Sequence, residues 1–264
     1  MTFLPLIIYV LVGAVAGFLG GLLGIGGGLV TVPALLVTFT LLGFPEASSM
    51  RVAIGTSLGA MVFTSCVSAI SHLLRNGIYW PLFRTLTPGI VVGAVLNALL
   101  AKRLSGNELK LLFGFFECVC GLYFCFFRQK KRVQEFKIPN FLILFVIGLG
   151  VGALSTLLGI GGGLVTLPIL LSFGTPMKNA IATSAAMGFF TAIVGTVSFL
   201  LIGLHEKTFE GAIGYLYVPA FITIGIASML AVPLGVKLTY RLPTSLLKRI
   251  FGVILILAGI SMFY

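Results

Sequence analysis

Hydroxyl side chains recur at matching places in the two halves of this 264-residue chain. Thr31 follows a run of glycines, and Thr56 stands next to Ser57 in the apolar segment that comes after it. The second half repeats both features, with Thr166 and with the pair Thr183–Ser184. Hydroxyl groups, like the free N–H groups at the start of a helix, donate hydrogen bonds without carrying charge. The spacing therefore predicts neutral donors that suit an anion.

The glycines belong to a sequence that occurs twice, LGIGGGLVTVPALL at residues 23–36 and LGIGGGLVTLPILL at residues 158–171. Twelve of the fourteen positions are identical. Glycine is unfavourable inside a helix and readily adopts positive φ, so each cluster predicts a break in a helix. Pro33 and Pro168 follow five residues after each cluster, where a proline is tolerated near the start of a new helix.

The composition places these segments in a membrane. The chain is 59% hydrophobic and 9% charged, whereas about 25% of the residues of a soluble domain are charged. Most apolar stretches approach the ~20 residues with which a helix crosses hydrocarbon. The ~10-residue alternating strands of a β-barrel are missing from the sequence. We therefore predict an all-α polytopic membrane protein, located as a multi-pass protein in the plasma (inner) membrane.

An internal repeat extends well beyond the glycines. Ala53–Ser57 is echoed by Ala180–Ser184, and Arg103–Gly114 shares several residues with Arg241–Gly252. Two homologous halves of this kind are common among secondary transporters. The prediction is a single membrane domain at 1–264, with repeat 1 at about 1–127, a basic loop at 128–137 and repeat 2 at about 138–264.

The distribution of Lys and Arg indicates whether each broken segment crosses the membrane or returns to the side from which it started. A continuous helix over the uncharged residues 138–177 would be about 60 Å long, twice the ~30 Å thickness of hydrocarbon. If each broken segment returns to its starting side, twelve Lys and Arg lie on one side and five on the other, whereas single crossings give eight and nine. We predict that each repeat is a Gly-broken hairpin followed by three transmembrane helices. The repeats are then inverted, with both termini extracytoplasmic and the loop at 128–137 cytoplasmic.

The two breaks are expected to form one substrate site near the bilayer midplane. Irregular backbone at membrane depth must be buried in protein or line a cavity, and paired broken helices point to such a site. The predicted substrate-binding residues are Gly26, Gly27, Gly28, Thr31, Pro33, Thr56, Ser57, Gly161, Gly162, Gly163, Thr166, Pro168, Thr183 and Ser184.

Packing is the alternative role for glycines, because small residues four apart let helices approach closely. Gly13/Gly17 and Gly89/Gly93 are pairs of this kind, and we expect them to serve packing. For the two clusters the site interpretation is favoured, since they coincide with overlong segments. GIGGGL is neither a dinucleotide fingerprint nor a phosphate loop, because it lacks the last glycine of the first and the lysine of the second.

Other function classes find little support. The net charge is +11, but five basic residues fall in the loop at 128–137, where they indicate contact with anionic lipid rather than with nucleic acid. With two histidines and no H-E-x-x-H motif the sequence argues against an enzyme, and we expect no catalytic residue, metal or cofactor. Glu117 lies in an apolar segment. It could carry a coupling proton, but we favour snorkelling or pairing with a basic loop residue.

Two copies of G-x-G-G-G-x-x-x-x-P, at Gly24–Pro33 and Gly159–Pro168, are each followed by A-x-x-T-S. With these motifs nearly the whole chain resembles the TauE/SafE sulfite exporters, also called the toluene-sulfonate uptake permease family. The resemblance implies a secondary transporter of sulfite, sulfonate or another small sulfur-containing or organic anion. The expected partners are a small anionic substrate and membrane lipid, and a homo-oligomer is left open. The alternatives are a channel-like or scaffolding protein without coupled transport and, less favoured, a membrane-embedded enzyme.

Overall fold

The structure, a computed structural model, describes residues 3–101, 103–126, 140–206, 208 and 210–263. Helices dominate these parts of the chain, and the predicted basic loop at 128–137 lies outside them. The helices are α1 (Phe3–Leu23), α2 (Gly28–Leu41), α3 (Glu46–Leu73), α4 (Trp80–Ala101), α5 (Gly106–Phe126), α6 (Phe141–Leu158), α7 (Gly163–Ser172), α8 (Met177–Gly203), α9 (Val218–Thr239) and α10 (Thr244–Ser261).

One element departs from the all-α expectation. Two short strands, β1 (Ala212–Ile213) and β2 (Leu216–Tyr217), pair antiparallel just before α9. Gly211 and Gly214 have positive φ angles of 85° and 59°, which favour the tight turns around this hairpin. The hairpin therefore precedes α9, which begins at Val218.

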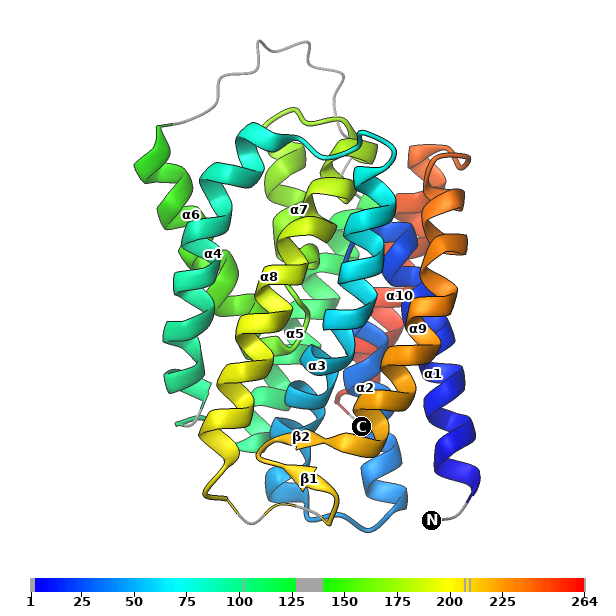
Figure 1. The fold of residues 1–264 in the computed structure, drawn as a ribbon, viewed down its shortest axis with the longest axis vertical. Coiled ribbons are helices and arrows are strands. Elements are labelled where there is room, and N and C mark those ends of the chain that lie inside the picture. Colours follow the sequence, from blue (N-terminus) through cyan, green and yellow to red (C-terminus); the bar gives the residue numbers. More distant parts are fainter. Residues whose placement is uncertain (1–2, 102, 127–139, 207, 209, 264) are drawn as a thin grey trace.

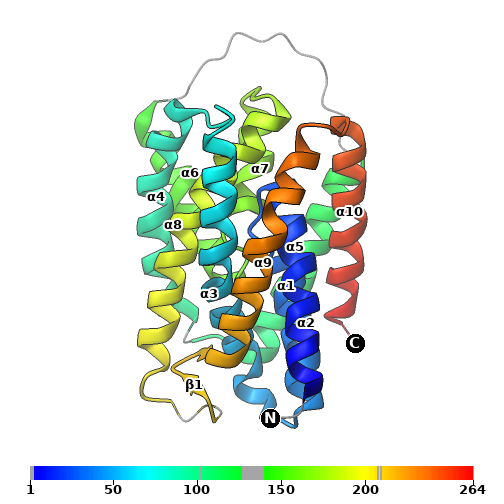
Figure 2. The same ribbon diagram turned by 45° about the vertical axis from the view of Figure 1, so that its right-hand side comes forward.

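Both broken segments are helical hairpins (Figures 1 and 2). α1 begins and α2 ends at one end of the bundle, whereas α6 begins and α7 ends at the opposite end. Between the hairpins α3, α4 and α5 run from one end of the bundle toward the other, and α8, α9 and α10 do so after the second hairpin, with α10 ending partway along the bundle (Figure 2). Each broken segment thus returns to the end at which it started, as the charge distribution favours.

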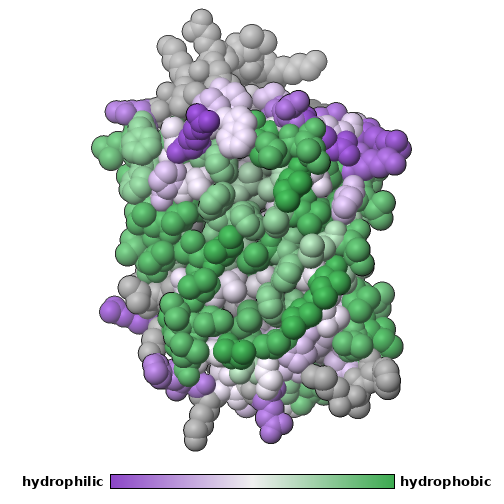
Figure 3. All heavy atoms as spheres, in the orientation of Figure 1, coloured by the Kyte–Doolittle hydropathy of each residue, from purple (hydrophilic) through white to green (hydrophobic). Residues whose placement is uncertain are grey.

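The outer surface suits a lipid environment. Among the described residues, six helices are long and apolar enough to cross a membrane: α1, α3, α5, α6, α8 and α9. α4 and α10 run alongside them (Figure 1). In Figure 3 hydrophobic side chains cover the middle of the visible face, and hydrophilic ones gather toward its two ends. The chain is therefore a multi-pass membrane protein.

Glycines set the closest helix contacts. α1 packs along α9, and α6 packs along α4. A Cβ on Gly17 would overlap the carbonyl oxygen of Ser228, and a Cβ on Gly93 would overlap that of Leu149. Gly13 and Gly89 meet the same two partner helices, where a Cβ would overlap the carbonyl oxygens of Ile224 and Phe145. The packing role predicted for these pairs is confirmed, because only a residue without a side chain fits there.

Candidate functional site between the two helix breaks

Each break is made by glycine in a left-handed backbone conformation. Gly27 immediately precedes α2 and has φ 89°. Gly162 immediately precedes α7 and has φ 81°. Residues with a Cβ seldom adopt these angles, so glycine allows the chain to turn and start a new helix within the bundle. The breaks lie where the glycine clusters predict them.

The two breaks contact each other in the interior. A Cβ on Gly28 would overlap the carbonyl oxygen of Gly159, and a Cβ on Gly163 would overlap that of Gly24. The contact is reciprocal, because the first residue of each new helix meets the break of the other half. Packing therefore explains Gly28 and Gly163, and the same packing brings the starts of α2 and α7 together. The first N–H groups of a helix have no partner within it.

Serine hydroxyls tie each half to the break of the other. Ser57 on α3 donates a hydrogen bond to the carbonyl oxygen of Gly159 at 3.1 Å. Ser184 on α8 donates to the carbonyl oxygen of Gly24 at 3.2 Å and to that of Ile181 at 2.9 Å. Both serines are fully buried. The predicted site serines thus lie at the breaks, where they hold the two glycine turns in place.

The neighbouring threonines hold helix starts. The backbone N–H of Tyr217, just before α9, donates to Oγ1 of Thr56 at 2.9 Å. The N–H of Tyr79, just before α4, donates to Oγ1 of Thr183 at 2.8 Å. Each threonine therefore accepts a hydrogen bond from a segment far away in the sequence, a contact that the motifs did not predict. Thr56 and Thr183 position α9 and α4 in this conformation.

The threonines of the short helices face their own breaks. Thr31 donates to the carbonyl oxygen of Gly27 at 3.0 Å, and Thr166 donates to that of Gly162 at 2.6 Å. Both side chains are buried, and their hydroxyl hydrogens are used within the first turn of the helix. Pro33 and Pro168 lie inside α2 and α7, where each removes one backbone hydrogen bond. The carbonyl group four residues before each proline thus lacks its usual backbone donor.

Met61 is a residue of this region that the sequence motifs did not reveal. Its Cε methyl occupies the space in which a Cβ on Gly26 or on Gly161 would lie. Its sulfur is 3.9 Å from Oγ of Ser57, which donates to it, and the side chain is buried. Met61 therefore fills the space between the two glycine turns. Its position four residues after Ser57, on the same face of α3, is the signal that could have identified it.

Glu117 is the acidic side chain within this interior. It is 0% exposed, and neither carboxyl oxygen has a hydrogen-bond partner in the described part of the chain. The expectation that it snorkels to the membrane surface is wrong, because the side chain does not reach the surface. Burial between helices, which one sequence cannot show, is the reason for the difference.

A cationic cluster surrounds Tyr240 at the end of the bundle where α3 and α9 finish. The guanidinium carbon of Arg75 is 5.2 Å from the ring centroid. Nζ of Lys178 donates to the carbonyl oxygen of Tyr240 at 3.0 Å, and Nδ1 of His72 is 3.1 Å from its hydroxyl. Burial raises the pKa of Tyr240 while Arg75 acts in the opposite direction, so the phenol is neutral. A pocket of about 320 Å³ here is lined by Ser71, Leu74, Arg75 and Pro233.

Arg51 occupies the corresponding place at the other end of the bundle. Its guanidinium carbon lies 5.9 Å from the ring centroid of Tyr215, and Nη2 donates to the carbonyl oxygen of Leu104 at 2.8 Å. Arg51 precedes Thr56 by five residues, as Lys178 precedes Thr183. A cation thus lies near the start of both α3 and α8.

Metal-binding groups do not gather in the described residues. No set of three or more His, Cys, Asp or Glu side chains within them could hold a metal ion. The cysteines Cys66, Cys118, Cys120 and Cys125 are free thiols. The chemistry available at the breaks is therefore that of backbone groups, hydroxyls and one thioether.

A bundle of membrane helices in which two opposed broken helices meet defines the architecture of a polytopic transport protein. Residues 9–262 match the family described as Sulfite exporter TauE/SafE. The chain belongs to this family, a family of membrane transporters.

Two similar proteins match nearly the full length of the chain and a third matches a short segment. A probable membrane transporter protein of Haemophilus influenzae is 34% identical over 259 residues, covering 98% of both chains. One of Methanocaldococcus jannaschii is 32% identical over 273 residues, covering 99% of this chain and 96% of the relative. An Arabidopsis thaliana protein named Sulfite exporter TauE/SafE family protein 5 is 40% identical over 55 residues, 21% of this chain and 12% of its own. No solved structure matches.

Proposed function

We propose that the protein is a secondary transporter of a small anion, bound near the midplane of the plasma (inner) membrane between the two helix breaks. The observation that carries the proposal is the reciprocal contact of the breaks, in which Gly28 meets Gly159 and Gly163 meets Gly24. This contact brings two helix starts to one point of the interior. Free N–H groups and the positive ends of two helix dipoles favour an anion there without a basic side chain.

The substrate class follows from the donors and from the family. Backbone N–H groups and hydroxyls match the oxygen atoms of a sulfite or sulfonate, and the family description names sulfite export. Another small sulfur-containing or organic anion would use the same donors. Acidic side chains, which a cation path requires, are rare in the spans.

The contacts also support inverted repeats, with repeat 1 at about 1–127 and repeat 2 at about 138–264. Ser57 bonds to the second break as Ser184 bonds to the first. Thr56 accepts from the residue before α9 as Thr183 accepts from the residue before α4. The hairpins enter from opposite ends of the bundle (Figure 2). Rocking one half against the other would open the breaks alternately to the two sides.

At the proposed site the side chain of Met61 closes the space between the two glycine turns. The thioether fills the space beside Gly26 and Gly161, so an anion enters only when Met61 rotates or α3 moves. Met has three rotatable bonds and adapts readily to a changed neighbourhood. We infer that Arg51 at one end, and Arg75 with Lys178 at the other, attract anions toward the closed centre.

Ligand-dependent stability and flux together test the proposal. Purified protein is heated with sulfite, sulfate, thiosulfate, isethionate or chloride, and a bound substrate is expected to raise the melting temperature in a concentration-dependent manner. The best binder is then followed into proteoliposomes as a radiolabelled compound. With a carrier, uptake saturates as the substrate concentration rises, and excess unlabelled anion inside the vesicles accelerates it. Uptake that rises linearly with concentration would indicate a channel, and no shift with any anion would contradict anion binding.

A further inference from the structure

Glu117 lies at mid-depth in the membrane. It is the twelfth residue of the 21-residue helix α5 (Gly106–Phe126), about 15 Å from either end. Along the partner helix α10, a Cβ on Gly114 would contact the carbonyl oxygen of Gly259, and a Cβ on Gly121 that of Gly252. Glu117 is therefore level with the middle part of α10.

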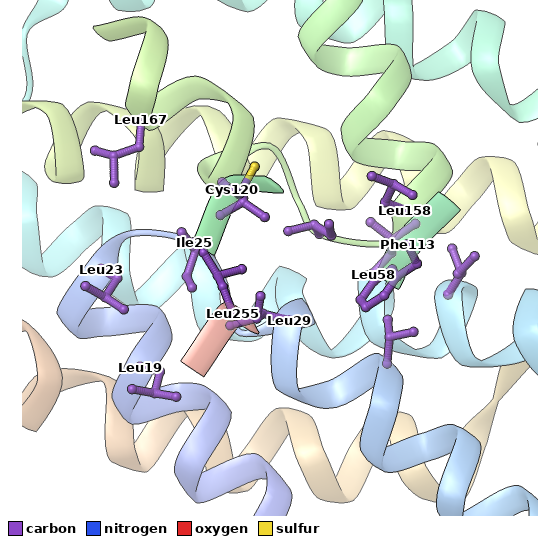
Figure 4. Close-up of a cluster of buried hydrophobic side chains, with 14 of the residues drawn as sticks. Leu19, Leu23, Ile25, Leu29, Leu58, Phe113, Cys120, Leu158, Leu167 and Leu255 are labelled. Atoms are coloured by element: carbon purple, nitrogen blue, oxygen red, sulfur yellow. The ribbon is translucent and has the colours of Figure 1, made fainter. Parts of the chain in front are cut away.

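The carboxyl group lies on the face of α5 that points into the bundle. Phe113 and Cys120, four residues before and three after Glu117, are on the same helix face and belong to the buried core. Figure 4 shows Phe113 beside Leu158, which precedes the second break, and Cys120 near Ile25, which lies within the first. Glu117 is thus placed between side chains that flank the two breaks.

The basic groups on the helices around Glu117 are too far away to act as a counter-ion for its carboxyl group. Helices α6 and α2 contain no ionisable residue. Arg51 of α3 binds the carbonyl oxygen of Leu104, which precedes Glu117 by thirteen residues, or about 20 Å of helix. No Lys or Arg lies within five residues of Glu117 on α5 or of the level residue Leu255 on α10. The ionisable residues of α3, α5 and α10 are Glu46, Arg51, Cys66, His72, Glu108, Lys110, Cys118, Cys120, Tyr123, Cys125, Lys248 and Arg249.

The described structure therefore places a carboxyl group with both oxygens unbonded in an apolar interior. An isolated carboxylate is strongly disfavoured in such a place, whereas a protonated carboxyl group is neutral and offers one O–H donor. The group is consequently protonated in this closed conformation. Ionisation requires that the helices move and that water reaches it.

We propose that Glu117 is the proton-binding site that couples anion transport to proton movement, an inference that rests on the proposed function. The carboxylate takes one proton from water on one side of the membrane and becomes neutral. In that form it no longer repels an anion at the adjacent breaks, so both can be enclosed together. On the other side the carboxyl group returns the proton to water as the anion leaves, and proton and anion move in the same direction.

Two variants of α5 separate this role from a structural one. Glu117→Gln keeps the size and the neutral charge of the protonated group but binds no proton. Glu108→Gln is the matched control, because Glu108 is an exposed carboxylate on the same helix that accepts hydrogen bonds from Ser105. Size-exclusion profiles of both are expected to equal that of the wild type.

The first measurement needs no substrate. Infrared difference spectra of the full-length protein at neutral pH, wild type minus Glu117→Gln, are expected to contain the carbonyl band of a protonated carboxyl group. The same subtraction with Glu108→Gln is expected to lack it. Absence of the band in the first subtraction would overturn the proposal, whatever the transported anion is.

The second measurement uses proteoliposomes that contain a pH dye and receive isethionate, a sulfonate that stays ionised and carries no proton itself. We expect isethionate to acidify the lumen with wild type and Glu108→Gln, and the rate to fall at least tenfold with Glu117→Gln. Acidification at the wild-type rate by Glu117→Gln would overturn the proposal. If radiolabelled isethionate does not enter with the wild type, isethionate is not a substrate, and absence of the infrared band would still overturn the proposal.

Discussion

The two helix breaks share almost the same sequence but have different neighbours. When Ser57 is aligned with Ser184, the residue four positions later is Met61 on α3 and Gly188 on α8. Met61 fills the space between the glycine turns, whereas Gly188 lies against the backbone of Gly161. The shared residues thus build the turns, and the residues that differ decide what occupies the space between them.

The same contrast continues on both sides of the breaks. The turn before the first break contains Gly20 and Gly21, which pack tightly against neighbouring helices. The second has Ser155 and Thr156 at these positions, fully buried with hydroxyls that bond to no described group. Glu117 likewise corresponds to Leu255. Buried hydroxyls without partners thus precede the second break where glycines precede the first, so the two breaks are not interchangeable.

The largest effect is expected at the glycines that precede the short helices. Gly27→Leu and Gly162→Leu should abolish transport, since a side chain would occupy the region where the helix starts meet. The alanine variants should differ from each other. A Cβ on Gly27 would lie 2.7 Å from the backbone oxygen of Ala16, but a Cβ on Gly162 would lie 2.9 Å from a threonine hydroxyl that can rotate.

Thermal unfolding in detergent measures this difference. We expect Gly27→Ala to lose about 2–5 kcal/mol, from left-handed strain and overlap together, and Gly162→Ala to lose clearly less. Gly43→Ala is the control, because Gly43 has φ 69° with no atom within 4 Å and so reports the strain alone. Equal losses for Gly27→Ala and Gly162→Ala would show that the two breaks are packed alike.

Met61 offers the next largest effect. Met61→Ala removes the side chain between the glycine turns, and stability should fall by about 2–5 kcal/mol. At the same time bulkier sulfonates should bind relatively better, because the space beside Gly26 and Gly161 becomes available. Calorimetric titration with methanesulfonate and benzenesulfonate measures the preference. Met187→Ala is the control, because it also truncates a buried methionine of the core; it should lower stability without changing the preference between the two sulfonates. If Met61→Ala also leaves that preference unchanged, Met61 does not line the site.

The sequence predicted the fold more completely than the candidate site. The glycine clusters and the charge count were sufficient for the breaks and the hairpins, because backbone freedom and loop charge depend on local sequence. Contacts between the halves were not predictable. The bond from Ser57 to Gly159, the position of Met61 and the burial of Glu117 depend on how distant helices pack, and a single sequence carries no such information.

A moderate effect is expected for the serines that tie the halves. Ser57→Ala loses the bond to Gly159, and a neutral hydrogen bond contributes about 0.5–1.5 kcal/mol. Ser184→Ala should cost about the same or slightly more, since its hydroxyl serves two carbonyl groups. Chemical or thermal unfolding compares the two, and the double variant should show additive losses if the two ties are independent. A loss near zero for both would mean that the ties do not hold the breaks.

The smallest effect is expected for the threonines inside the short helices. The hydroxyls of Thr31 and Thr166 already donate to Gly27 and Gly162. Thr31→Val or Thr166→Val should therefore weaken anion binding by about tenfold or less, the equivalent of one neutral hydrogen bond. Titration with the best-binding sulfonate measures it. A hundredfold loss would mean that the hydroxyl turns toward the anion when it binds.

The central claim is that the anion binds where the two breaks meet, and an anomalous difference map tests it most directly. Crystals of the protein grown with selenite or with a bromine-substituted benzenesulfonate would locate the heavy atom without reference to side-chain density. We predict a peak between the turns at Gly26–Gly28 and Gly161–Gly163, with Met61 displaced. A single peak beside Arg75, Lys178 and Tyr240 at the end of the bundle, with Met61 unmoved, would contradict the account.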